Sequence, residues 1–161
     1  MANTSADRSS ALDTIEAILE ATNGSTTTTK VLWGGAAAIP IGVGLNPFAT
    51  VEFGGEDEKE ETFGNVMVWH TFEIGLHWPV SPEEAVAKTR LLAIWNACRD
   101  VQGALRADST LGEKVSGMQI GIARLELTEI AVPGANGGSI PLESLRFTLR
   151  LQELEGEAVA R

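Results

Sequence analysis

Apolar and polar side chains alternate most regularly in residues 65–78. Every even position of this stretch is apolar except His70, and a period of two predicts a β-strand with one face in the core. The first odd positions, Met67 and Trp69, are apolar as well, so we expect the first half of the strand to be covered on both faces. This segment is the clearest strand in the sequence.

The strand is also unusually long. At about 3.3 Å per residue, its 14 residues would extend roughly 46 Å, more than twice the common strand length of about 17–20 Å. Either it bends sharply or part of it projects as an arm. We expect an arm that pairs with a neighbouring subunit, because an unpaired arm would expose a row of backbone donors and acceptors. The candidate subunit-interface residues on its outer phase are Met67, Trp69, Thr71 and Glu73.

An amphipathic helix is predicted for residues 5–22, because apolar side chains recur there at three- and four-residue spacing. Ser9 or Ser10 is a possible N-cap, and Asn23-Gly24 is a stop signal. If this helix covers the outer phase of the long strand, it buries Trp69 within the subunit. That arrangement is the alternative to a subunit contact through Trp69.

A second, longer helix is predicted from Ser81 to about Ala107. Ser81, followed by Pro82 and Glu84, has the pattern of a capping box with proline at the first helical position. At 1.5 Å per residue this helix spans roughly 37 Å, enough to cross a sheet. Its buried stripe is expected to hold Ala85, Thr89, Leu92, Trp95, Cys98, Val101 or Gln102, and Leu105.

Shorter alternating segments predict the remaining strands. A phase slip near Ala123-Arg124 indicates a β-bulge. Two segments rich in glycine and proline, Gly34–Pro47 and Ala131–Gly138, are expected to be connections. The predicted strands are Lys30–Trp33, Phe48–Phe53, Met118–Leu127 and Leu145–Leu151.

This order of elements predicts an α+β fold in one domain over residues 1–161. We expect a largely antiparallel β-sheet with one long helix packed across it and an additional N-terminal helix. A chain of 161 residues is long enough for a single continuous core. Residues 153–161 are expected to form a frayed tail.

The charge of the chain opposes tight binding to nucleic acid. Its 22 acidic and 12 basic residues give a formal charge of −10, which removes the electrostatic attraction to phosphate. An acidic protein can still surround DNA that has to slide past without binding. The acidic run Glu56–Glu61 is expected to be a solvated loop or hairpin tip.

Candidate chemistry is sparse. His70 and His77 lie in opposite phases of one strand, so they cannot share a metal ion, and we expect His70 in the core and His77 at the surface. Cys98, the only cysteine, is expected to be a small buried hydrophobe. Residues 42–47 are glycine-rich but do not lead into a helix that could bind phosphate. We expect no catalytic residue, no cofactor and no metal site, and hence no enzyme.

The stretch from Phe72 to Ile130 resembles the middle of siphophage tail terminator and tail completion proteins. In those proteins a strand similar to residues 71–76 leads, through a capped start similar to residues 81–85, into a long helix. That helix ends in a segment similar to residues 104–112. Two long strands and a final one similar to Leu145–Leu151 follow, and an initial helix precedes. The order of elements matches over most of the chain.

The resemblance implies a structural virion protein that forms a hexameric ring on the head-proximal end of the tail tube. Such a ring ends tube polymerisation, contacts the tail tube protein on one face and presents a docking surface to the neck or head connector on the other. DNA would pass through its bore without specific binding. The residues that we expect to face that bore are Glu56, Asp57, Glu58, Glu60 and Glu61.

The expected location is the virion, after assembly in the host cytoplasm. The sequence has no apolar run long enough to cross a membrane and its start lacks the order of a secretory signal, so we expect no membrane contact. A neck or head-closure protein of the same kind of virion is the main alternative. The second alternative, from a different class, is a small enzyme or ligand-binding domain unrelated to virions.

Overall fold

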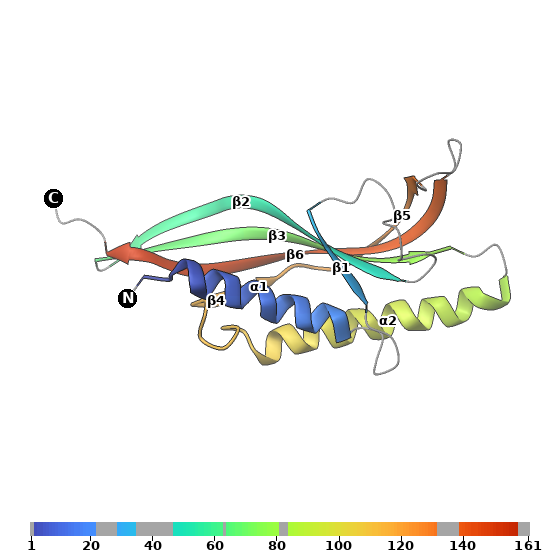
Figure 1. Cartoon of the computed structure of the whole chain (residues 1–161), viewed down its shortest axis with the longest axis horizontal. Helices are drawn as coiled ribbons and strands as arrows, with labels where there is room; N and C mark the ends of the chain where they lie inside the picture. The colour runs from blue at the N-terminus through green and yellow to red at the C-terminus, as the bar shows by residue number, and fades with distance from the viewer. Residues whose placement is uncertain are drawn as a thin grey trace.

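The computed structural model describes residues 2–21, 29–34, 47–62, 64–80, 84–131 and 139–157. In this part of the chain a six-stranded sheet carries two helices on one face (Figure 1). This arrangement confirms the predicted α+β fold. The elements are α1 (Ser5–Glu20), β1 (Lys30–Trp33), β2 (Phe48–Thr62), β3 (Asn65–Pro79), α2 (Glu84–Ala107), β4 (Gly117–Ile120), β5 (Arg124–Ala131) and β6 (Ser139–Glu157).

The strand order is β1-β2-β3-β6-β4, and β5 also pairs with β6. All pairs are antiparallel except β1 with β2, which is parallel. β4 and β5 follow one another along the same edge of β6, and the break between them lies where Gly121 N donates to Thr148 O over 2.8 Å. The irregularity predicted near Ala123-Arg124 therefore lies at this break.

The prediction that β3 projects as an arm is wrong. Its outer neighbour β2 pairs with it from Phe48 opposite His77 to Thr62 opposite Asn65. On its other edge β6 pairs with it along the same length, from Glu157 opposite Asn65 onward. Since both edges of β3 are occupied within its own chain, it cannot add a strand to a neighbouring subunit.

Two further corrections explain why β3 needs no partner subunit. The acidic run Glu56–Glu61, predicted to be a solvated loop or hairpin tip, is the part of β2 that leads into the hairpin with β3, and Glu153–Glu157, predicted to be frayed, belongs to β6. Glutamate disfavours strands only weakly, whereas each residue that pairs with β3 adds backbone hydrogen bonds to the ladder. These backbone hydrogen bonds outweigh the weak strand propensity of glutamate. The β2–β3 pairing ends with Thr62 opposite Asn65.

The core lies between the helices and the lower face of the sheet in Figure 1, which we call the helix face. Predicted inward residues of β6 and β3, such as Leu149 and Ile74, are fully buried there. The predicted stripe of α2 is correct for Val101 and Leu105 but wrong for Leu92 and Trp95, which are 56% and 63% exposed. The residues of α2 buried in the core are Ile94, Ala97, Val101 and Leu105.

The first helix begins one turn earlier than its predicted caps. Thr4 is the N-cap: its hydroxyl accepts from the amide of Asp7, and its own amide donates to the Asp7 carboxylate over 2.8 Å. Ser9 and Ser10 lie inside α1 instead. Predictions on Asn23-Gly24, Ser81–Glu83 and the segments 35–46 and 132–138 lie outside the described residues.

Candidate assembly surfaces

The two histidines lie on opposite faces of the sheet, as predicted, but their environments are reversed. His77 is buried on the face of the sheet opposite the helices, which we call the open face. There its Nε2 is 2.8 Å from Thr50 Oγ1 and its Nδ1 is 2.7 Å from Ser144 Oγ. Its ring stacks on Phe48 with centroids 4.8 Å apart. Burial, and then the charge of Arg146, lower the pKa of His77 to about 4. It is a neutral group that joins three strands, since it lies on β3 and its partners lie on β2 and β6.

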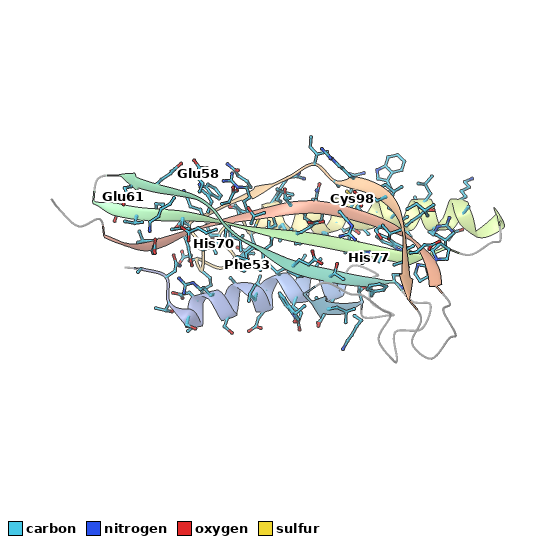
Figure 2. All side chains as sticks on the ribbon, turned by 90° about the horizontal axis from the view of Figure 1, so that it is seen from above. Phe53, Glu58, Glu61, His70, His77 and Cys98 are labelled. Atoms are coloured by element: carbon cyan, nitrogen blue, oxygen red, sulfur yellow. The ribbon has the colours of Figure 1, made fainter. Side chains whose placement is uncertain are left out.

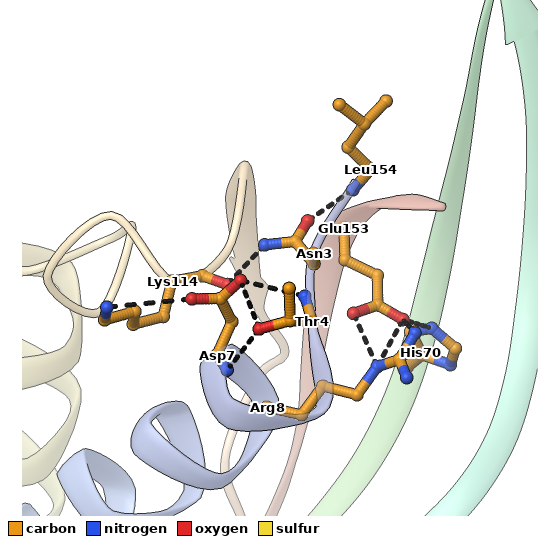
Figure 3. Close-up of polar contacts among 8 residues, drawn as sticks. All are labelled: Asn3, Thr4, Asp7, Arg8, His70, Lys114, Glu153 and Leu154. Carbon is orange, nitrogen blue, oxygen red and sulfur yellow. Dashed lines mark hydrogen bonds and ion pairs between the residues drawn. The ribbon is translucent and has the colours of Figure 1, made fainter. Parts of the chain in front are cut away.

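His70 is only partly buried and lies on the helix face. Its Nε2 is 2.7 Å from the carboxylate of Glu153, which Arg8 also binds through two nitrogens at 3.0 Å. Glu153 is buried, whereas the Arg8 side chain is 55% exposed. These three residues join α1 to β3 and β6 (Figure 3).

The N-terminal segment before α1 is fastened beside this cluster. Asn3 donates to Lys114 O over 2.8 Å and accepts from Leu154 N over 2.7 Å (Figure 3). These bonds hold the start of the chain against β6 and against the turn after α2. The position of α1 along the sheet is therefore fixed at its first turn.

Replacing Glu153 by Gln should lower the free energy of unfolding by about 1–2 kcal/mol, because a buried carboxylate with two charged or polar partners becomes neutral. The exposure of Arg8 keeps the expected loss at this modest value. Urea unfolding at neutral pH measures it. The control is Glu155→Gln, whose ion pair with Lys59 is exposed on both sides and screened by water, so its loss should change the free energy of unfolding much less. Equal losses in the two variants would contradict the structural role of Glu153.

An apolar groove opens between α1 and the β1–β2 edge of the sheet. Its cavity has a volume of about 610 Å³. Two of its lining side chains are well exposed, Trp33 at 46% and Phe53 at 63%. Arg8, His70 and Glu153 are the polar residues of its wall. We call this the edge groove, and define it by its large apolar residues Leu12, Trp33, Val51, Phe53, Phe72 and Leu151.

A second apolar surface lies at the opposite edge, on α2 and around β5. Gln102 of α2 donates to Gly121 O over 3.3 Å, and Arg90 binds Glu143 of β6 over 2.7 Å. These two contacts place α2 alongside β5, because Glu143 pairs with Leu127. We call this the α2–β5 surface; its exposed residues are Leu91, Leu92, Trp95, Ile122, Leu125 and Leu127.

The side chains of α2 that are exposed here share one side of the helix. At 100° per residue, Leu91, Trp95 and Gln102 fall within one narrow arc, and Gln102 is the residue that contacts the β4–β5 connection. Leu125 pairs with Leu145 and therefore points to the helix face, toward the layer that contains α2. The exposed apolar side chains of α2 and β5 therefore lie along the same edge of the sheet. Figure 2 shows the two helices under opposite edges of the sheet.

The predicted interface residues Met67, Trp69, Thr71 and Glu73 occupy odd positions of β3 and lie together on the open face. Trp69 is not covered by α1, which is on the other face; the guanidinium of Arg150 lies 4.8 Å from its ring centroid. Arg150 in turn binds Asp57 and Glu58.

The predicted bore-facing acids do not share a face. Glu58 and Glu60 stand opposite Trp69 and Met67 and point to the open face, where Asp57 also binds Arg150. Glu56 and Glu61 stand opposite His70 and Val66 and point to the helix face. In a strand successive side chains alternate, so the run that looked uniform in sequence is divided between two surfaces.

The described residues contain no cluster of three or more His, Cys, Asp or Glu side chains that could bind a metal ion. Cys98 is half-buried against the core, and this burial raises the pKa of its thiol. Among the helices of the described part, none is both long and apolar enough for a membrane span.

Comparison with known proteins identifies no family. No family model matches the chain, and no curated protein matches it. Among solved structures, one protein aligns with 89% of this chain and 94% of its own, at 13% identity and a TM-score of 0.38. A likeness this weak supports neither a fold nor a function.

Sequence reasoning missed both apolar surfaces. The edge groove is assembled from five elements, which no local pattern could bring together. The α2–β5 surface did leave a signal: α2 has more large apolar residues than one buried stripe can hold, with Leu91 and Leu92 adjacent and Trp95 next to Ile94. Such an excess indicates either a fully buried helix or a helix with a second apolar contact.

Proposed function

We propose that this protein is a structural subunit that assembles into a closed ring, and that the ring caps the head-proximal end of a phage tail tube. One observation carries the ring: two unlike apolar surfaces, the edge groove and the α2–β5 surface, lie at opposite edges of one sheet. Contacts between unlike surfaces propagate from subunit to subunit and close into rings when the rotation allows. Contiguous exposed apolar surface of this kind marks an interaction site.

The tail-terminator role itself rests on the resemblance of residues 72–130 and on the charge of the chain. If the subunits of a ring contact each other through the two edges of the sheet, one face of the sheet points toward the ring axis and the other points outward. Among the strand residues whose side chains the structure describes, the open face carries six carboxylates against four basic side chains. We place this face toward the bore, because exposed cations on α2 would retain DNA phosphates there. The six are Glu52, Asp57, Glu58, Glu60, Glu73 and Glu126, and the four are Lys30, Arg124, Arg146 and Arg150.

The ring is tested by native mass spectrometry and negative-stain electron microscopy of the purified protein. We expect a closed ring. The resemblance to tail terminator proteins implies that this ring has six protomers. A chain that remains at its monomer mass of 17.1 kDa at high concentration would remove the ring proposal. A second step adds the ring to polymerising tail tube protein of the same virion. Capping of one tube end supports a terminator, whereas binding only to the head connector would identify a neck protein.

A further inference from the structure

The edge groove and the α2–β5 surface are both exposed in one chain, and the question is what covers them. We propose that they cover each other: the α2–β5 surface of one protomer docks into the edge groove of a second copy, with Trp95 entering beside Trp33 and Phe53. This inference rests on the proposed ring and names its subunit contact.

The two surfaces match in apolar character. Trp95 and Phe53 are each 63% exposed, and large aromatic side chains dominate the energetics of protein interfaces. The groove volume of about 610 Å³ is in the range that accommodates bulky apolar groups. Phe53 already packs on Phe72 with centroids 5.1 Å apart, so the wall of the groove is formed before docking.

The two surfaces also lie at nearly the same level along the sheet. Arg90 binds Glu143, so this part of α2 lies beside Glu143 of β6. Gln102 binds Gly121, which pairs with Thr148, so that part of α2 lies beside Thr148. Trp95 comes between Arg90 and Gln102 and therefore lies between these two positions along β6. On the other edge, Trp33 pairs with Val51.

Val51 pairs with Ile74, and Ile74 pairs with Phe147. Trp33 therefore lies across the sheet from Phe147, a position on β6 between Glu143 and Thr148. A second copy placed edge to edge therefore brings Trp95 to the groove without a large shift along the strands. A small shift favours a closed ring over an open helical array.

Charge favours the same contact. On α2, Lys88, Arg99 and Arg106 are exposed, lie on the same side as Trp95, and have no ion pair among the described residues. Along β2 the acidic residues predominate, and Glu56 stands opposite His70, which lines the groove.

The carboxylates of Glu56 and Glu61 point to the helix face beside Lys59, whose ammonium is already bound by Glu155 at 2.9 Å. Glu155, Glu56 and Glu61 together raise the pKa of Lys59. Negative charge remains in excess at this edge. Opposite charges at the two edges steer unlike edges together and oppose pairing of like edges. A second copy of this acidic chain is therefore a fitting occupant, because its docking helix presents the exposed cations Lys88, Arg99 and Arg106.

The experiment uses two variants of the full chain, Trp95→Asp and Phe53→Asp. Each places a charge in one surface and leaves the other surface intact. Alone, each variant should run as a monomer of 17.1 kDa in native mass spectrometry, whereas the wild type forms the ring. Mixed in equal amounts, the two should form a 1:1 dimer and nothing larger, because only one intact surface of each kind remains.

With the wild type and these two variants, three outcomes overturn the inference. If both variants still form the wild-type ring, the contact lies elsewhere and the ring proposal survives. If the folded variants stay monomeric when mixed, the surfaces do not bind each other. If the wild type itself is a monomer, the proposed function fails together with the inference. Groove occupancy by a small apolar molecule in the mass spectrum of such a monomer would point to ligand binding instead.

Matched controls separate docking from folding and from the open face. Ala104→Asp adds the same charge to an exposed position on the far side of α2, and Thr148→Asp adds it to the open face. Both should retain the ring. Trp69→Ala should also retain it, because Arg150 covers Trp69 away from both edges. A ring lost only in Trp69→Ala would place the subunit contact on the open face and overturn the inference. Circular dichroism confirms that every variant is folded.

Discussion

Gly75→Ala should destabilise the protein by about 3–5 kcal/mol, far more than an added methyl group costs at an ordinary site. A Cβ atom at this position would lie 2.6 Å from His77 Nε2 and 2.7 Å from Thr50 Oγ1. It would separate the two atoms of a buried hydrogen bond and leave both without their partner. The constraint is one of space, because Gly75 does not have a positive φ. The midpoint of urea unfolding at pH 7.5 measures the loss.

Gly103→Ala is the control for this substitution. A Cβ at Gly103 meets nothing within 4 Å, and the residue lies within α2. Alanine should therefore stabilise the helix by roughly 0.5–1 kcal/mol. If Gly75→Ala unfolded at the wild-type denaturant concentration, His77 and Thr50 would have room to separate, and the tight packing around His77 would be refuted.

Periodicity recovered those elements whose two faces differ. The even phase of β3 and the odd phase of β6 are buried as predicted, with Ile74, Leu76 and Leu149 in the core. A strand with one apolar face has only one way to lie on a core, so its local pattern decides. The fold class followed from these strands and from the two helices.

Choices between two apolar faces could not be made locally. The pattern of α2 allows a stripe through Trp95 or one through Ile94, and the second is buried because Val101 and Leu105 extend it in the structure. Which stripe packs depends on where Gln102 finds its partner in the β4–β5 connection and Arg90 its partner on β6. Those partners are between 19 and 53 residues away in sequence.

The composition of a segment could not predict which strands it pairs with either. Glu56–Glu61 looks like a loop because its charges require water, yet an edge strand supplies both water and backbone partners. His77 was expected at the surface because Glu73 and Gly75 precede it in the same phase. Thr50 and Ser144, which satisfy its ring nitrogens, come from two other strands. The apolar surfaces at the two edges have the same origin, since each is assembled from distant segments.

Acid should destabilise the fold through His77 well before most carboxylates titrate. Its pKa falls from 6.5 to about 4 on folding, first because burial disfavours the charged ring and then because Arg146 repels it. The unfolded chain therefore binds the proton more tightly than the folded chain. The stability that this provides is complete above pH 6.5, and it is lost progressively as the pH falls from 6.5 toward 4. At pH 5 the loss should be about 2 kcal/mol relative to pH 8.

Urea unfolding of the wild type and of His77→Gln, at several pH values and one protein concentration, isolates this contribution. Gln offers hydrogen bonds toward Thr50 and Ser144 but has no group that titrates in this range. The variant should be less stable at pH 8 and change little down to pH 5, so the two curves should converge on acidification. Parallel curves would mean that the ring of His77 accepts a proton without cost.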